Sequence, residues 1–218
     1  VFGIDNFDYI LVPLCLNNKI NLYLLSNDKQ GYEVRNFETV DNMIVSNIEF
    51  NNCELNNNEL VFSTEKKAFF TKLDYIVDLA ILSACSQSLG IIDKMYDLTL
   101  DYCKTRKQFG KPIGSFQVNQ HKLVDMYIIK EEMRSLNYMA QLTFDSKVEE
   151  RRRNVSLNKI FLGTHAKNMA QSCIQLHGGM GVAKEMSIGH YFSKITSYCN
   201  LFGNTSYHKE RFASNDKF

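Results

Sequence analysis

One long stretch of helical periodicity limits the folds open to this chain. No proline separates Pro13 from Pro112, and from Ser63 onward apolar side chains recur every three or four residues. The repeat opens on a Ser-Thr-Glu-Lys run that is typical of a capped helix start. This pattern predicts one helix of about 40 residues, or about 60 Å at 1.5 Å per residue.

Two further helices are predicted by the same periodicity, at about 117–144 and about 154–177. Three long helices joined by short links indicate an antiparallel bundle. The charged run at 149–153 then falls in a link, where we expect it to be solvated, with a phosphate contact as the less favoured alternative. Long helices with apolar residues on more than one side favour burial against another chain, so we expect a homo-oligomer.

The amino-acid composition changes near residue 63. Residues 1–62 hold 13 of the 21 asparagines. Short apolar runs in this part alternate with Asn-, Ser- and Asp-rich turns, and they lie at 8–16, 20–25, 43–50 and 60–62. We therefore predict an α+β fold, with a small antiparallel β unit over residues 1–62 and an antiparallel bundle of long helices over residues 63–218.

Charge and cysteine usage exclude several classes of protein. A net charge of +1 gives no field for a nucleic-acid backbone, so we expect a small molecule or another subunit as partner. The six cysteines show no CxxC pair, which argues against zinc and disulfides and favours a cytoplasmic location. We expect no bound metal, no membrane span and no signal segment. Because the chain starts at Val1 inside a strand-like pattern, we also expect that a natural N-terminal part is missing.

A basic segment follows the first long helix, at residues 102–117. Arg106 stays charged at all relevant pH values, and the Gly110-Lys111-Pro112 break after it turns the chain away from the helix. A guanidinium beside free backbone groups suits a pyrophosphate. Taken alone, the segment is more typical of a helix C-terminus with basic residues and a glycine cap.

A glycine-rich segment covers residues 175–182. Three glycines in four residues allow the backbone to approach a ligand with no side chain in between. The alternative is a tight turn that ends the third helix. The segment also lacks the strand-to-helix context of a dinucleotide-binding fingerprint.

Together and in this order, the motifs resemble those of the acyl-CoA dehydrogenase family. The residues that carry the resemblance lie at 106–113, 116–117, 125–126, 175–181, 190–192 and 201–203. The resemblance covers nearly the whole chain. It implies that residues 1–62 are the latter part of the family's middle β domain and that residues 63–213 are its C-terminal helical domain.

The resemblance implies an FAD-dependent flavoprotein of lipid and fatty-acid metabolism. Such an enzyme removes two hydrogens across Cα and Cβ of an acyl-CoA thioester, passes electrons to an electron-transfer acceptor, and works as a tetramer or paired dimers. The residues that match contacts to a neighbouring subunit's FAD are Arg106, Gln108, Phe109, Phe116, Gln117, Gln175, Gly178 and Gly179. Those that match contacts to the subunit's own FAD are Asn204, Thr205 and Ser206.

The usual catalytic base is missing from both positions where the family carries it. The glutamate that precedes the matching Gly203 in many members is Phe202 here, and the alternative position in the first long helix is Ala80. Neither side chain can take a proton. Asp78 aligns near the acyl-CoA and is a weak substitute, so Asp78 and Gly203 are the predicted substrate contacts. His177 and His208 we interpret as hydrogen-bonded structural residues.

Three functional readings follow. The first is an acyl-CoA dehydrogenase that acts within an oligomer. The second is a non-catalytic subunit of a mixed complex that completes a partner's FAD site, because the Leu-Phe-Gly form resembles a branch with such subunits. The third is a related flavin enzyme, such as an oxygenase, that needs no carboxylate at this position. The acyl chain is not determined by these residues.

Overall fold

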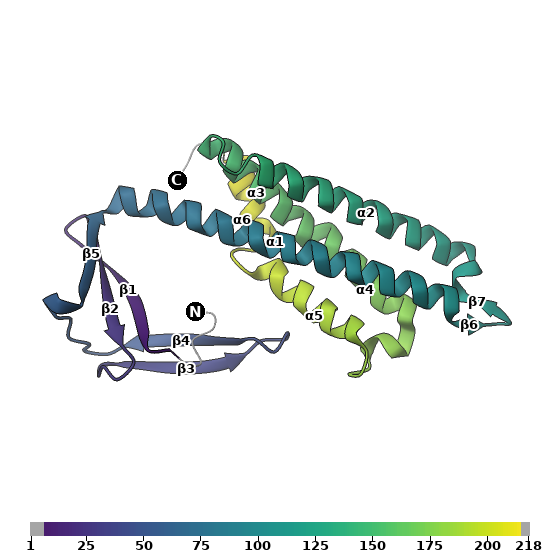
Figure 1. The fold of residues 1–218 in the computed structure, drawn as a ribbon, viewed down its shortest axis with the longest axis horizontal. Coiled ribbons are helices and arrows are strands. Elements are labelled where there is room, and N and C mark those ends of the chain that lie inside the picture. The colour runs from purple at the N-terminus through teal and green to yellow at the C-terminus, as the bar shows by residue number, and fades with distance from the viewer. Residues whose placement is uncertain (1–6, 215–218) are drawn as a thin grey trace. The chain divides into compact units, whose positions relative to one another are not determined.

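The computed structural model describes residues 7–214 of the chain (Figure 1). The chain divides into two compact units, Val1–Ile76 and Val77–Phe218. The division falls inside the first helix, and each unit is described by itself below. The domain boundary predicted at 62/63 marks the end of the asparagine-rich turns and stays a prediction.

Two antiparallel sheets make up the first unit. β1 (Tyr9–Leu16) pairs with β2 (Lys19–Ser26), which also pairs with β5 (Leu60–Glu65) in a three-stranded sheet. β3 (Tyr32–Glu38) and β4 (Ile44–Phe50) form a second, two-stranded sheet. The mixed α+β fold is confirmed. Sequence periodicity missed β3, because charged and polar residues separate its Tyr32, Val34 and Phe37 and no continuous apolar run forms.

In the turns of this unit, asparagine occupies positions with positive φ, where glycine is the usual residue. Asn17 and Asn18 have φ of 49° and 63° between β1 and β2, which is the backbone of a type I′ hairpin turn. The amide side chain tolerates this left-handed conformation better than most side chains do. Ser63, which we expected near the helix cap, instead lies in β5, where its hydroxyl donates to Asn21 Oδ1 at 2.6 Å. Strand pairing with β2 thus delays the helix start to Lys66.

The first helix, α1 (Lys66–Thr105), has the predicted length of 40 residues. Its apolar composition is high enough that an 18-residue window reaches a mean hydropathy of 1.6, so by length and composition alone it could cross a bilayer. The expectation that the chain has no membrane span stays a prediction. The buried side chains of α1, such as Ile81, Cys85 and Ile92, pack into the helical core, which explains the composition.

The second predicted helix is confirmed, and the third is longer than predicted. α2 runs over Gln117–Leu142. α3 (Val148–Phe161) continues through a π-helical segment, Leu162–Ala166, into α4 (Lys167–His177). The charged run at 149–153 therefore lies in the first turns of α3 and not in a link. Its two glutamates interact favourably with the helix dipole at this N-terminus. Glu149, Glu150 and Arg153 are exposed as expected, but Arg151 is only 6% exposed, so the expectation of a solvated run is wrong at that residue.

Two shorter helices complete the second unit, and the periodicity of the sequence did not predict them. α5 covers Ser187–Asn200 and packs on α4, and α6 covers Thr205–Ala213 and packs on α3. Short helices of 14 and 9 residues repeat too few times to be recognised from spacing alone.

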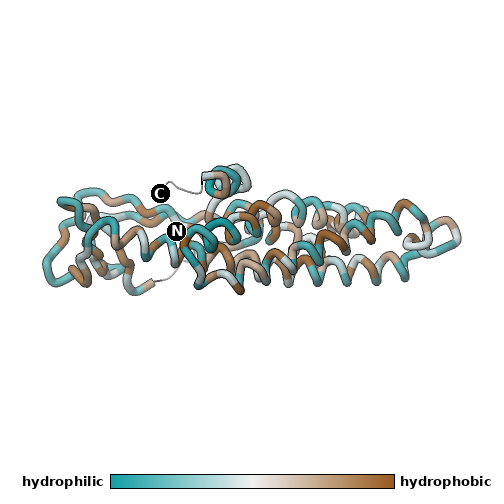
Figure 2. The backbone as a smooth tube through the Cα atoms, turned by 90° about the horizontal axis from the view of Figure 1, so that it is seen from above, coloured by the Kyte–Doolittle hydropathy of each residue, from teal (hydrophilic) through white to brown (hydrophobic). Residues whose placement is uncertain are grey.

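The helices share one apolar core. Apolar residues recur turn by turn along them, shown brown in Figure 2. The predicted core methionines Met126 and Met133 are at most 2% exposed. Four of the cysteines are buried, and all six are free. Within residues 7–214 no group of three or more His, Cys, Asp or Glu side chains is placed to hold a metal ion.

Candidate functional site

The basic segment after α1 folds into a short hairpin. β6 (Lys107–Gln108) pairs with β7 (Lys111–Pro112). The two turn residues, Phe109 and Gly110, have φ of 54° and 81°, as a type I′ turn requires. A positive φ is unfavourable for a residue with a side chain such as Phe109. Phe109 is also 92% exposed, so its ring contributes little to the stability of the fold.

A groove of about 380 Å³ lies beside the hairpin. Its lining brings together the basic segment and the glycine-rich segment, which are about 60 residues apart in the sequence. The lining residues are Gln108, Phe109, Ile113, Phe116, Val118, Asn119, Lys122, Gln175 and Leu176. The rings of Phe109 and Phe116 meet edge to face with centroids 6.2 Å apart. The groove therefore offers aromatic surface next to three carboxamides.

The helix that begins at the groove presents open donors to it. Phe116 stands at the start of α2 and forms no side-chain cap hydrogen bond, since a phenyl ring has no acceptor oxygen. The amide of Asn119 donates to the Phe116 carbonyl, whereas the amides of Gln117 and Val118 have no partner among the described residues, and open N–H groups at a helix start attract anions. Residues 104–122 also include five Lys or Arg and no Asp or Glu. Both features suit a phosphate group.

The glycine-rich segment forms the turn that ends α4. Gly178 has φ 60° and ψ −140°, a backbone that glycine alone adopts readily. A Cβ added at Gly178 or Gly179 would meet nothing within 4 Å, so their backbone faces open space. Gly181 is different, because a Cβ there would lie 2.7 Å from the carbonyl oxygen of Ile174. The turn is thus closed on one side by packing and open on the other.

A stacked ring pair joins the two halves of this region. Tyr102, near the end of α1, stacks on His177, at the end of α4, with ring centroids 4.4 Å apart. His177 is 4% exposed, and its Nδ1 is 2.9 Å from the carbonyl oxygen of Cys173, which requires a proton on Nδ1. These contacts agree with the structural role predicted for His177.

A second group of predicted residues lies between α5 and α6. Phe202 and Gly203 have φ of 58° and 105°. A Cβ on Gly203 would come within 2.5 Å of the Tyr207 ring, so only glycine fits. Asn204 caps α6 by accepting a hydrogen bond from the Tyr207 amide at 3.0 Å. Thr205 packs against Gly163 of the π-helical segment, while Ser206 is exposed.

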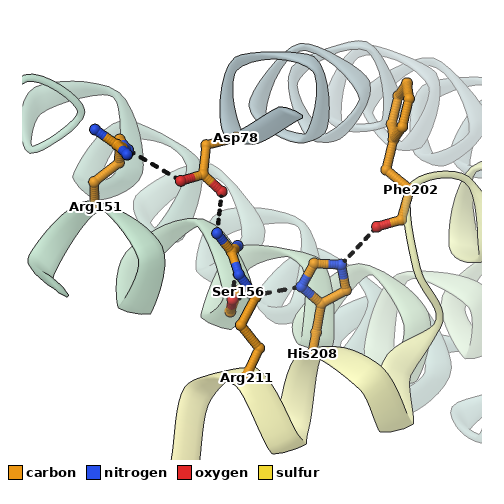
Figure 3. A network of polar contacts seen from close by, with 6 residues as sticks. All are labelled: Asp78, Arg151, Ser156, Phe202, His208 and Arg211. Atoms are coloured by element: carbon orange, nitrogen blue, oxygen red, sulfur yellow. Dashed lines mark hydrogen bonds and ion pairs between the residues drawn. The ribbon is translucent and has the colours of Figure 1, made fainter. Parts of the chain in front are cut away.

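Asp78, the candidate base, is fully buried in an ion-pair cluster (Figure 3). Its Oδ2 lies 3.0 Å from Arg151 Nε, and its Oδ1 lies 2.5 Å from Arg211 Nη2. Both arginines are 6% exposed. Two guanidinium groups bind the carboxylate and occupy both of its oxygens, which is an arrangement for joining α1, α3 and α6.

His208 is buried next to this cluster. Its Nε2 lies 3.1 Å from the carbonyl oxygen of Phe202, and its Nδ1 lies 3.4 Å from Ser156 Oγ (Figure 3). Burial is the main cause that lowers the pKa of His208 to about 4, with smaller contributions from the positive charges of Lys159 and Arg211 and an opposing one from the Phe202 carbonyl. His208 is therefore neutral near pH 7.

Sequence comparison decides which family has this arrangement. The sequence profile described as "Acyl-CoA dehydrogenase, C-terminal domain" matches residues 79–215, which is more than half of the chain. The chain belongs to the acyl-CoA dehydrogenase family. Members of this family of oxidoreductases depend on FAD.

Curated relatives are similar over the helical part. An acyl-CoA dehydrogenase, IpdE2, of Mycolicibacterium smegmatis is 29% identical over 128 residues, or 59% of this chain and 39% of that protein. A probable acyl-CoA dehydrogenase, YngJ, of Bacillus subtilis is 33% identical over 119 residues, covering 55% of this chain and 31% of that protein. The matches thus span less than two fifths of the length of these relatives.

Solved structures share the fold over nearly the whole chain. An acyl-CoA dehydrogenase from Slackia heliotrinireducens superposes with a TM-score of 0.86 at 18% identity, covering 97% of this chain and 57% of that one. The ChsE4-ChsE5 complex from Mycobacterium tuberculosis gives a TM-score of 0.80 at 23% identity, with coverage of 94% and 54%. At these identities the likeness concerns the fold.

Within this acyl-CoA dehydrogenase fold, the predicted FAD residues form two separate sets. Gln108, Phe109, Phe116 and Gln175 line the groove, with Arg106, Gln117, Gly178 and Gly179 in the segments that border it. Asn204, Thr205 and Ser206 belong to the start of α6. Figure 1 places the hairpin and α6 toward opposite ends of the second unit, with α5, 14 residues or about 21 Å long, between the glycine turn and α6.

The main residues that sequence reasoning missed are Arg151, Ser156 and Arg211. They lie on α3 and α6, and they reach Asp78 and His208 only because these helices pack together. No motif or spacing in the sequence joins them. The one available signal was Asp78 itself, a carboxylate within an apolar helix face, because such a group requires a buried partner.

Proposed function

We propose that this chain forms the C-terminal part of an FAD-dependent acyl-CoA dehydrogenase-like protein, and that its groove contributes to the FAD site of a neighbouring subunit. One observation carries the proposal: the groove unites the basic and glycine-rich motifs on one surface with aromatic, amide and cationic groups. Bound FAD would supply the two-electron acceptor for α,β-dehydrogenation of an acyl-CoA thioester.

The chemistry of the donors fits FAD. Within residues 7–214 the side chains of Arg106, Gln108 and Gln175 make no hydrogen bond or ion pair, and all three are exposed. A pyrophosphate needs a permanent cation and N–H donors, which Arg106 and the first amides of α2 offer. The carboxamides of Gln108 and Gln175 can pair with polar ring edges, and Phe109 and Phe116 can pack against a planar group.

The position of the second set supports a shared site. Asn204, Thr205 and Ser206 lie at the far end of α5 from the glycine turn. We therefore propose that the groove serves a neighbour's FAD while the start of α6 serves the chain's own. Exposed apolar residues on α2, such as Val124 (57%), Ile128 (49%) and Leu142 (86%), support burial of this helix against another chain. A homo- or hetero-oligomer, as a dimer or tetramer, is part of the proposal.

The cofactor role is tested by flavin content. We expect Arg106→Ala to lower the affinity of the purified assembled protein for FAD by about tenfold or more, because a charge-assisted hydrogen bond contributes about 1.5–3 kcal/mol. Lys104→Ala is the control, since Lys104 is also basic and exposed but lies before the hairpin. Equal FAD affinity in the unchanged protein and in Arg106→Ala would contradict the proposal.

A non-catalytic subunit of a mixed complex is the second candidate function. Phe202 and Ala80 occupy the two positions that match the family's base, and Asp78 is held by two arginines. Among the residues that the structure describes, none of these three positions offers a carboxylate open to substrate. In a mixed complex, the proton of the acyl-CoA α-carbon would be taken by a residue of the partner chain.

An anaerobic titration with a panel of acyl-CoAs separates the two candidates. We would follow the visible flavin absorbance of the protein alone and with a co-encoded homologue. Bleaching by the protein alone supports a dehydrogenase with its own base, and bleaching only with the homologue supports the non-catalytic subunit. Phe202→Glu then asks whether only the base is missing, since a gain of bleaching in that variant would show an otherwise competent pocket.

Several finer points stay predictions. They are the acyl chain, the electron-transfer acceptor, a role in fatty-acid metabolism and the cytoplasmic location. The oxygenase reading also stays open to the same titration, because it predicts no bleaching by any acyl-CoA.

A further inference from the structure

A chain of buried polar contacts crosses three helices and ends on the backbone of Phe202. We propose that Asp78, Arg211, Ser156 and His208 form a positioning relay that fixes the backbone at Phe202 and Gly203, and so the direction of the side chain at position 202. The conformational claim stands on its own geometry. Its value for catalysis rests on the function proposed above.

The hydrogen bonds of the relay have one direction. The Phe202 carbonyl only accepts, so His208 Nε2 must carry the proton that it donates across 3.1 Å. Nδ1 of the neutral ring is then an acceptor and faces the Ser156 hydroxyl at 3.4 Å. Because Ser156 donates its only O–H to His208, its oxygen is left to accept from outside the pair.

Arg211 and Asp78 complete the sequence. Arg211 Nη1 donates to Ser156 Oγ at 3.3 Å, and Arg211 Nη2 donates to Asp78 Oδ1 at 2.5 Å. Asp78 also accepts from Arg151 at 3.0 Å, which fixes its second oxygen. Figure 3 shows this line of contacts from the Asp78 carboxylate on α1 to the Phe202 carbonyl. The donors therefore follow one order, from Arg211 to Ser156, from Ser156 to His208 and from His208 to the Phe202 carbonyl.

The backbone at Phe202 needs such a support. Phe202 has φ 58°, a conformation uncommon for a residue with a side chain. Gly203 follows with φ 105°, and a Cβ there would lie 3.1 Å from His208 Nε2. No strand pairing holds these residues, unlike the turn of the β6–β7 hairpin. At Phe202 the buried His208 imidazole supplies the supporting hydrogen bond, as strand pairing does at the β6–β7 turn.

The relay holds the backbone of residue 202 and not its side chain. In Figure 3 the Phe202 ring points away from His208, while the carbonyl points toward it. A different side chain at this position would therefore be presented in the same direction. By the resemblance described above, position 202 is where many family members carry the catalytic glutamate, so the relay would fix the direction of whichever side chain stands at that position.

The absence of tryptophan from the chain makes a direct test possible. Phe202→Trp places one indole at the end of the relay, and acrylamide quenching and anisotropy report its mobility. In this background we compare His208→Leu, which removes the donor, with His208→Gln, which keeps an N–H of similar reach. Ser156→Ala removes the orienting hydroxyl. Lys209→Met is the control, because Lys209 is exposed on the same helix.

We expect His208→Leu to raise the fraction of molecules in which residue 202 has left its hydrogen-bonded conformation about fivefold, and acrylamide quenching to increase with it. This factor corresponds to about 1 kcal/mol for one lost hydrogen bond. Ser156→Ala should raise this fraction by less, and His208→Gln and Lys209→Met should leave quenching unchanged. Equal quenching in His208→Leu and in the parent would overturn the proposal. So would equal increases in His208→Leu and His208→Gln, because packing alone would then explain the effect.

Nitrogen NMR of the unsubstituted chain gives a second measurement that needs no variant to fold. The relay requires a neutral His208 with its proton on Nε2 at pH 7. A proton on Nδ1 would overturn it. Neither measurement uses flavin or acyl-CoA, so the relay and the proposed FAD site can fail separately.

Discussion

Two Phe-Gly pairs in the second unit have positive φ at both residues but are held by different means. Phe109-Gly110 has φ of 54° and 81°, and Phe202-Gly203 has φ of 58° and 105°. The first pair is the turn of a hairpin whose strands are adjacent in sequence. The second is held by His208, which in turn depends on residues of α1 and α3.

The difference separates two kinds of functional surface. At the hairpin, local pairing is sufficient, so Arg106 and Gln108 remain exposed and form no hydrogen bond or ion pair among the described residues. At position 202, buried polar and charged side chains from distant segments support the backbone. The stability of the fold and the direction of the side chain at position 202 therefore depend on the same atoms. Substitutions at the hairpin should therefore affect binding, whereas substitutions around position 202 should affect folding first.

The largest effect is expected at Asp78. Asp78→Ala leaves the guanidinium groups of Arg151 and Arg211 buried without their shared anion, and we expect a loss of about 3–5 kcal/mol in the free energy of unfolding. Urea unfolding followed by circular dichroism measures it. Asp97→Ala, at an exposed position of the same helix, should change stability by less than about 0.5 kcal/mol. Equal effects of the two substitutions would remove the distinction drawn above.

Adding one methyl group at Gly203, next to Phe202, and at Gly179, in the turn beside the groove, gives a matched comparison. Gly203→Ala must place a Cβ 2.5 Å from the Tyr207 ring at a φ of 105°, so we expect a loss of about 2–3 kcal/mol. Gly179→Ala meets nothing within 4 Å and should cost less than about 0.5 kcal/mol while weakening FAD retention. Thermal unfolding and flavin content test the two halves, and a stable Gly203→Ala variant would argue against the constraint.

The pH dependence of stability tests the buried histidine. The folded pKa of His208 is about 4, below its unfolded value near 6.5. Between these pH values the unfolded chain binds a proton that the folded chain does not, so the free energy of unfolding falls as pH falls from 6.5 to 4. We expect His208 to account for about 2.5 kcal/mol of this fall. His208→Gln should flatten the profile by that amount, and parallel profiles would contradict the assignment.

The smallest effect on stability is expected at the exposed ring of the first pair. Phe109→Ala should change the free energy of unfolding by no more than about 0.5 kcal/mol, because the ring is 92% exposed. Phe144→Ala, where the ring is 7% exposed, should cost about 3 kcal/mol or more. Chemical denaturation of both variants measures the contrast. A large loss in Phe109→Ala would mean that the ring is buried in solution, for example by another subunit.

Prediction from sequence succeeded where the determinants are local or periodic. The 40-residue α1, the start of α2 at Gln117 and the asparagine turn at Asn17 each follow from repeats or from neighbouring residues. It was less accurate at Ser63, where pairing with β2 overrides a helix cap, and at Arg151, where a buried partner replaces water. Both misses concern contacts with residues more than 40 positions away.

The sequence by itself determined the family, the order of the long helices and the residues of both motifs, because spacing and residue type carry that information. Only the tertiary structure decided that the motifs line one groove and that Asp78 pairs with two arginines. It also decided that His208 supports Phe202. These relations depend on which helix faces pack together, and the free energy of packing is shared over the whole core and is not encoded in any short segment.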